Sequence, residues 1–262
     1  MKSVHRVLDP SLGKQIPPGR CALAVMTKAP RPGAVKTRLT PPLTPEEAAA
    51  LNICFLRDTA AAIAQTMAER PACGIGVFTP AGANEAYAEI LPQEFELVPQ
   101  RGDKFGERLV CATEDLLRLG FSSVCLINSD SPTVPQSAFS QAVDFLDRSE
   151  DSVVLGPSDD GGYYLIGLKK LHRSLFEGID WSTDRVLAQT IERAREGDLP
   201  VHLLPTWYDV DDEETLHRLR RELAGSNGDP RTGFPAPATR GFLDELTEGE
   251  SRRRLPAEEV QP

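Results

Sequence analysis

Residues 21–38 read CALAVMTKAPRPGAVKTR and join an apolar segment to a basic one. The first part, Cys21 to Thr27, is a short continuous apolar run of the kind found in parallel strands that are buried on both faces. The segment from Ala29 to Pro42 is rich in proline and glycine and must be a loop. In open α/β sheets, ligands gather outside the carboxyl ends of the strands. The stretch therefore predicts a buried strand that carries a cationic loop to a ligand site.

The rest of the chain alternates expected strands with expected helices. Thr44 as N-cap, Pro45 at the first helical position and Glu47 in a capping box predict a helix that continues to about Ala68. Further expected strands are 74–79, 96–99, 123–128, 152–155, 163–168 and 201–205, and further expected helices are 84–90, 105–119, 136–147, 183–195 and 213–223. This alternation predicts a single-domain α/β protein, a three-layer α/β/α sandwich around a mostly parallel sheet.

The two ends of the chain differ in character from this core. Residues 1–20 are polar and contain Pro17-Pro18-Gly19, which predicts a loose N-terminal extension. The main domain is expected to span residues 21–224. Residues 225–262 are dominated by Gly, Pro, Ser, Arg and Glu, and we expect a flexible C-terminal tail with at most a short helix near 242–246.

Composition argues against several classes of partner. A net charge of −10 does not suit nonspecific nucleic-acid binding, which needs a broad basic surface. No stretch approaches the roughly 20 apolar residues that cross a bilayer, and residues 1–20 lack the apolar core of a signal peptide, so we expect neither a membrane partner nor export. The five cysteines stand singly, without a Cys-x-x-Cys pair, which indicates reduced thiols in the cytoplasm.

The loop after the first strand carries four cations within eleven residues, Lys28, Arg31, Lys36 and Arg38. Such side chains make charge-assisted hydrogen bonds to phosphates, and Gly33 with its neighbouring prolines holds the loop in a defined shape. A Walker loop and a G-x-G-x-x-G fingerprint are absent, which disfavours kinase, GTPase and dehydrogenase activities. We expect this loop to bind a di- or triphosphate; the alternative is an ordinary solvated basic loop.

Carboxylates follow two of the expected strands. Asp130 stands at the end of the 123–128 strand, and Asp209, Asp211 and Asp212 follow the last strand, with Asp209 and Asp211 on one side if the segment is extended. Asp130 and Asp211 together would suit Mg²⁺ or Mn²⁺, which needs only one or two protein carboxylates besides phosphates and waters. The structural alternatives are a turn cap for Asp130 and a helix cap for Asp211 or Asp212.

The segment GPSDDGGYY at 156–164 is a further candidate. Asp-Gly is a strong hairpin-turn signal, but paired glycines also allow a ligand to approach the backbone closely. The expected substrate-binding residues here are Asp159, Asp160, Gly161 and Gly162.

The segment RGDKFGER at 101–108 opens a helix. Backbone N–H groups at Gly102 and Asp103 would be available to a base or ribose, unless the segment is an ordinary charged helix start.

Taken together, these motifs resemble the GT-A-type nucleotide-diphospho-sugar transferase superfamily. Within it, the sequence is most similar to a bacterial glycosyltransferase-like family related to phospholactate and molybdenum-cofactor guanylyltransferases. The resemblance covers about residues 21–223 and rests on KAPRPGAVKTRL at 28–39, GDKFGER at 102–108, SDSP at 129–132, GPSDDGGYY at 156–164 and DVDD at 209–212.

The resemblance implies a GT-A fold and a divalent metal held by Asp130 and Asp211. It also implies that Lys28, Arg31, Lys36 and Arg38 line the phosphates of a nucleotide. One departure is that the A-G-G-x-S-x-R-M-G-type loop of nucleotidyltransferases is replaced here by a proline-containing loop.

The leading functional prediction is glycosyl transfer from a nucleotide-diphospho-sugar to a small-molecule acceptor, with Mg²⁺ or Mn²⁺ as cofactor. The metal and the basic loop would stabilise negative charge on the leaving nucleoside diphosphate, and Asp160 would act as general base. One alternative is a nucleotidyltransferase that joins an NTP to a phosphorylated acceptor and releases pyrophosphate, with Lys36 and Arg38 stabilising the phosphoryl transition state. Another is a nucleotide-binding protein without turnover.

Overall fold

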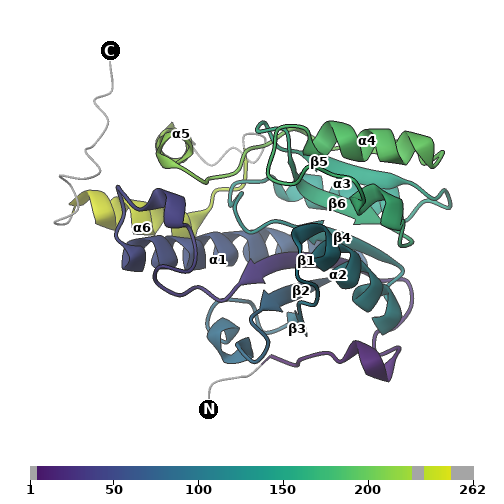
Figure 1. Cartoon of the computed structure of the whole chain (residues 1–262). Coiled ribbons are helices and arrows are strands. Elements are labelled where there is room, and N and C mark those ends of the chain that lie inside the picture. Colours follow the sequence, from purple (N-terminus) through teal and green to yellow (C-terminus); the bar gives the residue numbers. More distant parts are fainter. Residues whose placement is uncertain (1–4, 226–232, 249–262) are drawn as a thin grey trace.

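A computed structural model of the chain describes residues 5–225 and 233–248. Within these residues, seven strands form one sheet in the order β3-β2-β1-β4-β6-β5-β7 (Figure 1). Their bounds are β1 Cys21–Lys28, β2 Ala72–Thr79, β3 Glu96–Pro99, β4 Ser123–Ile127, β5 Val153–Pro157, β6 Tyr163–Leu168 and β7 Val201–Leu203. Only β6 runs antiparallel to its neighbours in this described sheet, so the predicted mostly parallel sheet is confirmed.

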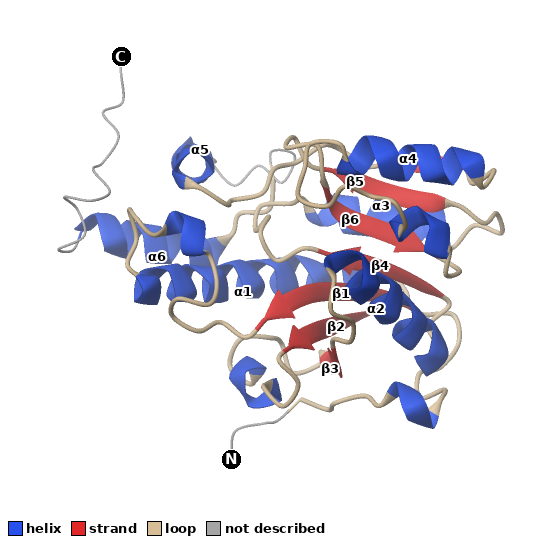
Figure 2. Cartoon of the chain, in the orientation of Figure 1, coloured by secondary structure: helices blue, strands red, loops and turns tan. Residues whose placement is uncertain are grey.

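Helices cover both faces of the sheet (Figure 2). Those described are α1 Pro45–Glu69, α2 Phe105–Leu119, α3 Gln136–Leu146, α4 Val186–Glu196, α5 Glu213–Gly225 and α6 Pro237–Glu248, with short 3-10 turns at Pro10–Leu12, Thr37–Leu39, Asn84–Tyr87 and Arg173–Phe176. Successive residues of β1 point to opposite faces. Leu23 and Val25 join the apolar cluster of α1, α3, α5 and α6, whereas Ala22 and Ala24 join the cluster of α2 and α4. This confirms the three-layer sandwich.

The start of α1 follows from local sequence. The Glu47 N–H donates to Thr44 Oγ1 at 3.1 Å, and the Thr44 N–H donates to Glu47 Oε2 at 2.7 Å. This is the predicted capping box, with Pro45 at the first helical position. The helix expected at 84–90 is instead a 3-10 turn, because the N–H groups of Ile90 and Leu91 both bond to the Tyr87 carbonyl and turn the chain toward β3.

The expected loose N-terminal extension is wrong for residues 5–20. Val7 forms a bridge with Leu97 of β3, and the Leu8 N–H donates to the Leu97 carbonyl at 2.8 Å. Leu8 and Ile16 are buried in the cluster that contains α2. The N-terminal segment, although its composition is polar, is therefore held by pairing with the edge strand β3 and by burial of its few apolar side chains. Residues 1–4 lie outside the described residues.

The expected flexible tail also differs from the structure at residues 233–248. α6 packs against α1, and Leu243 and Leu246 join the apolar cluster on that face. Asp58 of α1 accepts the N–H groups of Ala238 (3.0 Å) and Thr239 (2.8 Å), so the first turn of α6 is capped from another helix. The remainder of the expected tail, 226–232 and 249–262, lies outside the described residues.

None of the helices in the described part of the chain is long and apolar enough to span a membrane.

Candidate functional site

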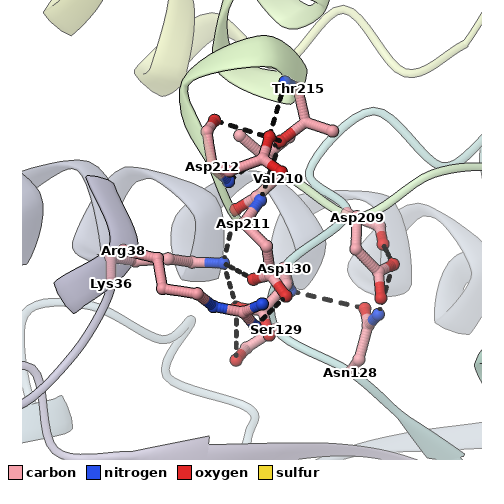
Figure 3. Close-up of polar contacts among 11 residues, drawn as sticks. Lys36, Arg38, Asn128, Ser129, Asp130, Asp209, Val210, Asp211, Asp212 and Thr215 are labelled. Atoms are coloured by element: carbon pink, nitrogen blue, oxygen red, sulfur yellow. Dashed lines mark hydrogen bonds and ion pairs between the residues drawn. The ribbon is translucent and has the colours of Figure 1, made fainter. Parts of the chain in front are cut away.

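The carboxylates of Asp130 and Asp211 meet on a single cation, the ammonium of Lys36 (Figure 3). Lys36 Nζ lies 2.6 Å from Asp130 Oδ1 and 3.1 Å from Asp211 Oδ1, and it donates a hydrogen bond to the Val210 carbonyl at 2.7 Å. The Lys36 side chain is only 4% exposed, whereas both carboxylates are about one-third exposed. The two acidic residues predicted to pair therefore share contact with one buried positive charge.

Three separate segments build this centre. Asp130 lies just beyond β4, Asp211 lies between β7 and α5, and Lys36 ends the loop after β1 in a left-handed conformation with φ of 48°. The Val210 N–H donates to the Asp130 carbonyl at 2.9 Å, which joins the two acidic segments. The cap of α5 is Asp212, whose Oδ1 accepts the Thr215 N–H at 2.9 Å. Asp211 is thus left to face Lys36.

Arg38 reaches the same centre from the solvent side. Its Nη2 lies 2.8 Å from Asp211 Oδ2, and its side chain is 74% exposed. An exposed guanidinium keeps its charge and retains freedom to turn toward a phosphate.

Asp209 is a site residue that the sequence analysis noted but did not assign. Its Oδ1 accepts hydrogen bonds from Asn128 Nδ2 (2.8 Å) and Ser131 Oγ (2.6 Å). Burial, followed by the charges of Asp130 and Asp160, raises the pKa of Asp209 to about 6, although the hydrogen bond from Ser131 opposes the shift. Its place in the DVDD motif could have signalled a role; its burial is a tertiary feature.

The donor set at this centre fits Mg²⁺ or Mn²⁺. Two carboxylate oxygens converge on one cation at distances of 2.6 and 3.1 Å, and such hard ions bind oxygen ligands, with phosphates and waters completing the shell. A zinc site would need three or four His, Cys, Asp or Glu side chains around one point. Among the described residues, no group of three or more such side chains is placed to hold a metal ion.

Two cavities flank the centre and share Arg38, Ser129, Asp130 and Asp211. The larger, of about 430 Å³, extends from the ends of β4 and β6 to the start of α2 and the 181–184 loop. The smaller cavity, of about 250 Å³, is lined by the loop after β1, including Lys28 and Lys36, and by Asn52 of α1. The centre therefore borders both cavities.

The residues of the Asp159-Asp160-Gly161-Gly162 turn between β5 and β6 have different surroundings. Asp160 and Gly162 line the larger cavity, and Asp160 Oδ1 accepts the Gly162 N–H at 2.9 Å. Gly161 has φ of +88°, and a Cβ there would lie 2.1 Å from the Asp184 carbonyl oxygen, so this glycine allows close packing of two loops. Asp159 points elsewhere and forms an ion pair with Arg218.

The other predicted binding residues are spread out. Lys28 lines the smaller cavity, whereas Arg31 and Gly33 line neither cavity. Gly102 and Asp103 also lie outside both, and the N–H of Asp103 already donates to Glu107 Oε2 at 3.1 Å. The structure thus gathers Lys28, Lys36, Arg38, Asp130, Asp160, Gly162 and Asp211 around the centre, and leaves the other predicted residues apart from it.

Phe105 and Trp181 were not anticipated at all. Their rings meet edge to face at a centroid distance of 5.1 Å, and both line the larger cavity. Phe105 could have been suspected as an apolar residue beside charged ones at the start of an amphipathic helix, but no local pattern marks Trp181.

Comparison with known proteins identifies relatives of this chain. The DUF2064 family model, described as an uncharacterized protein conserved in bacteria, matches residues 62–183. A crystal structure from Desulfovibrio desulfuricans G20, of a protein provisionally named a nucleotide-diphospho-sugar transferase, is 30% identical. The match covers 88% of this chain and 96% of that one, with a TM-score of 0.75. A comparison with curated proteins found no match.

More distant structures share the fold. CMP:2-keto-3-deoxy-manno-octonic acid synthetase in complex with CTP is 10% identical, with a TM-score of 0.52 over 79% of this chain and 99% of that one. The 4-diphosphocytidyl-2C-methyl-D-erythritol synthase of Anaerococcus prevotii DSM 20548 is 11% identical, with a TM-score of 0.51 over 78% and 96%. With its sequence motifs, its fold and its 30% identical relative in agreement, the chain belongs to the DUF2064 family of the GT-A-type nucleotide-diphospho-sugar transferase superfamily.

Proposed function

We propose that this protein is a metal-dependent transferase that acts on a nucleotide-activated substrate, with glycosyl transfer from a nucleotide-diphospho-sugar as the reaction. The observation that carries the proposal is that Asp130, just beyond β4, and Asp211, in the segment between β7 and α5, both contact the Lys36 ammonium at a position that borders two cavities. The 30% identical relative, provisionally named a nucleotide-diphospho-sugar transferase, supports the same substrate class.

The proposed metal ligands are Asp130 and Asp211. When bound there, Mg²⁺ or Mn²⁺ would act as a Lewis acid on the diphosphate oxygens. Lys36 and Lys28 would bind the phosphates from the smaller cavity, and Arg38 would bind them from the solvent side. These cations would stabilise the charge that develops on the departing diphosphate, which is an electrostatic form of catalysis.

In the proposed step, an acceptor hydroxyl in the larger cavity attacks the anomeric carbon of the sugar. The new bond joins the acceptor oxygen to that carbon, and the bond from the carbon to the diphosphate oxygen breaks. The electron pair of the broken bond stays on the nucleoside diphosphate. Asp160, which lines the larger cavity, takes the proton from the acceptor hydroxyl.

The first experiment measures binding of nucleoside diphosphates and nucleotide-sugars by calorimetry, with and without Mg²⁺ or Mn²⁺. We expect tight binding only with metal, and loss of the metal dependence in Asp130→Asn and Asp211→Asn. Asp159→Asn is the matched control, because this exposed carboxylate pairs with Arg218 and lines neither cavity. Metal-dependent binding that survives in Asp130→Asn would refute the assigned ligand set.

The second experiment identifies the reaction by its product. Glycosyl transfer releases a nucleoside diphosphate from a nucleotide-sugar, whereas nucleotidyl transfer releases pyrophosphate from an NTP. Pyrophosphate release that depends on Asp130 would replace the glycosyl proposal by nucleotidyl transfer on the same site. Binding without either product, across a broad acceptor panel, would favour a nucleotide-binding protein without turnover.

A further inference from the structure

The two cavities differ in the charged residues that each does not share with the other. Among the described residues, those found only in the larger cavity are Asp160, Asp184 and Asp209, all acidic. Those found only in the smaller cavity are Lys28 and Lys36, both basic. The electrostatic potential of these residues favours an anionic ligand in the smaller cavity and disfavours one in the larger cavity.

The smaller cavity has a second feature that suits a polar ligand. Asn52 of α1 lines it and is only 4% exposed, and its Oδ1 has no hydrogen-bond partner among the described residues. A buried amide oxygen without a partner costs free energy until a donor, such as a ligand hydroxyl or a water, reaches it. Lys28 and Lys36 suit the phosphates of the substrate and the Asn52 oxygen suits a hydroxyl of the same ligand, so both features favour the phosphate-bearing substrate in this cavity.

The larger cavity combines its acidic residues with an apolar lining. Phe105 is 54% exposed although it is a large apolar side chain, and it meets the edge of Trp181 at the cavity. The Trp181 indole packs over Gly106, where a Cβ would lie 2.7 Å from Trp181 Nε1, so the ring is seated against α2. Further aliphatic lining is formed by Met26, Leu109, Leu126, Ile127, Ile166 and Val186.

We propose that the larger cavity binds the acceptor, and that this acceptor is unphosphorylated, being uncharged or cationic, with an apolar face that packs on Phe105 and Trp181. This inference rests on the proposed function, since it assigns the acceptor of that reaction. Apolar rings and the apolar faces of sugars pack on aromatic side chains, and a cationic amine is attracted both to the aromatic rings and to the carboxylates. A phosphorylated acceptor would meet the three carboxylates that belong to this cavity alone.

Trp181 provides a direct probe, because the chain contains only one other tryptophan, Trp207. Trp207 lies outside both cavities and donates a hydrogen bond to Thr133 Oγ1 at 3.0 Å. The variant Trp207→Phe therefore leaves the fluorescence of Trp181 as a reporter of the larger cavity, without a need for nucleotide, metal or turnover.

The experiment measures how three compounds with the same ring shield Trp181 from quenching by acrylamide: benzyl alcohol, benzylamine and benzyl phosphate. We expect the alcohol or the amine to shield the indole at a concentration at least tenfold below that needed for benzyl phosphate. The comparison between the alcohol and the amine separates an uncharged acceptor from a cationic one. Equal or better shielding by benzyl phosphate, or no shielding by any of the three, would overturn the proposal.

A charge reversal tests the physical cause. Asp184 lines the cavity and has no catalytic role in the proposed reaction, so Asp184→Lys should lower the concentration of benzyl phosphate needed for shielding by at least threefold. Glu192→Lys, an equal charge change on the exposed side of α4, is the matched control and should leave it unchanged. An equal response of both variants would show that net charge, and not the cavity, sets the preference. If probe selectivity holds but nucleotide binding fails, the proposed function falls while the charge preference of the cavity stands.

Discussion

Replacement of Lys36 by Met removes the charge that holds Asp130 and Asp211 together while keeping a long unbranched side chain. The Lys36 side chain is 4% exposed and its Nζ lies 5.4 Å from the centre of the Phe55 ring, so a thioether is accommodated there. Removal of one partner from a fully buried ion pair costs about 3–5 kcal/mol, but both carboxylates here are about one-third exposed and water screens them. We therefore expect a loss of about 2 kcal/mol, or about 4–8 °C in the melting temperature.

The assay is thermal unfolding of wild type and Lys36→Met in a series of Mg²⁺ concentrations. The variant should melt lower without metal and should gain more from Mg²⁺ than wild type does, because two unneutralised carboxylates attract the ion more strongly. Arg38→Met is the control: this guanidinium is 74% exposed, and an exposed ion pair contributes about 0–1 kcal/mol. Equal melting temperatures of Lys36→Met and wild type, or equal responses to Mg²⁺, would refute the structural reasoning.

Three further predictions concern the fold around the site. Burial raises the pKa of Asp58 against hydrogen bonds that lower it, so Asp58 binds its proton more tightly in the native state than in the unfolded state. Wild type should therefore lose stability relative to Asp58→Asn as the pH rises from about 4 through the raised pKa, and denaturation curves across this range would show a constant difference if the pKa were unshifted. Gly161→Ala should lower the free energy of unfolding by at least about 2 kcal/mol, because a Cβ at φ of +88° would lie 2.1 Å from the Asp184 carbonyl oxygen. The control is Gly162→Ala, whose Cβ would lie 3.1 Å from Asp160 Oδ1, and thermal unfolding should give it a melting temperature several degrees above that of Gly161→Ala. Burial and the charge of Asp58 raise the pKa of Cys54 to about 11, so alkylation by iodoacetamide at pH 8, followed by mass spectrometry, should be slow in the native protein and fast once it unfolds.

The elements that could be predicted from sequence are those with local causes. The capping box at Thr44 and Glu47 begins α1 where it was expected, and the apolar runs at 21–27 and 123–128 form β1 and β4. The pairing of Asp130 with Asp211 also followed from a general rule, because carboxyl ends of parallel strands share one edge of the sheet. Each of these inferences needed only residues close together in sequence, or the topology of the fold.

The elements that were missed depend on partners distant in sequence. The N-terminal residues of α6 are capped by Asp58, which lies about 180 positions earlier in the sequence. Because this cap is distant, the local composition of the segment indicated only a loose tail. Leu8 is likewise held by Leu97 of β3. Trp181 reaches the larger cavity only because Gly106 leaves room for its indole. No local pattern reports such contacts, and the larger cavity was therefore the part of the site that sequence could not define.

Lys36 couples the phosphate loop to the carboxylate centre, and this coupling bears on how the two proposed ligands bind. Its ammonium contacts both Asp130 and Asp211, so a divalent cation that binds these carboxylates must displace it against like-charge repulsion. A buried ammonium that has lost its carboxylate partners needs another anion, and the adjoining cavity that Lys28 lines offers space for one. A diphosphate there would supply that anion and would also complete the shell of the metal. Metal alone is therefore opposed by Lys36, whereas metal and nucleotide together relieve each other's cost, and by thermodynamic reciprocity each must raise the affinity of the other by the same factor. The same lysine that stabilises the centre in the absence of ligands thus makes the centre respond to the pair of ligands that the proposed reaction requires.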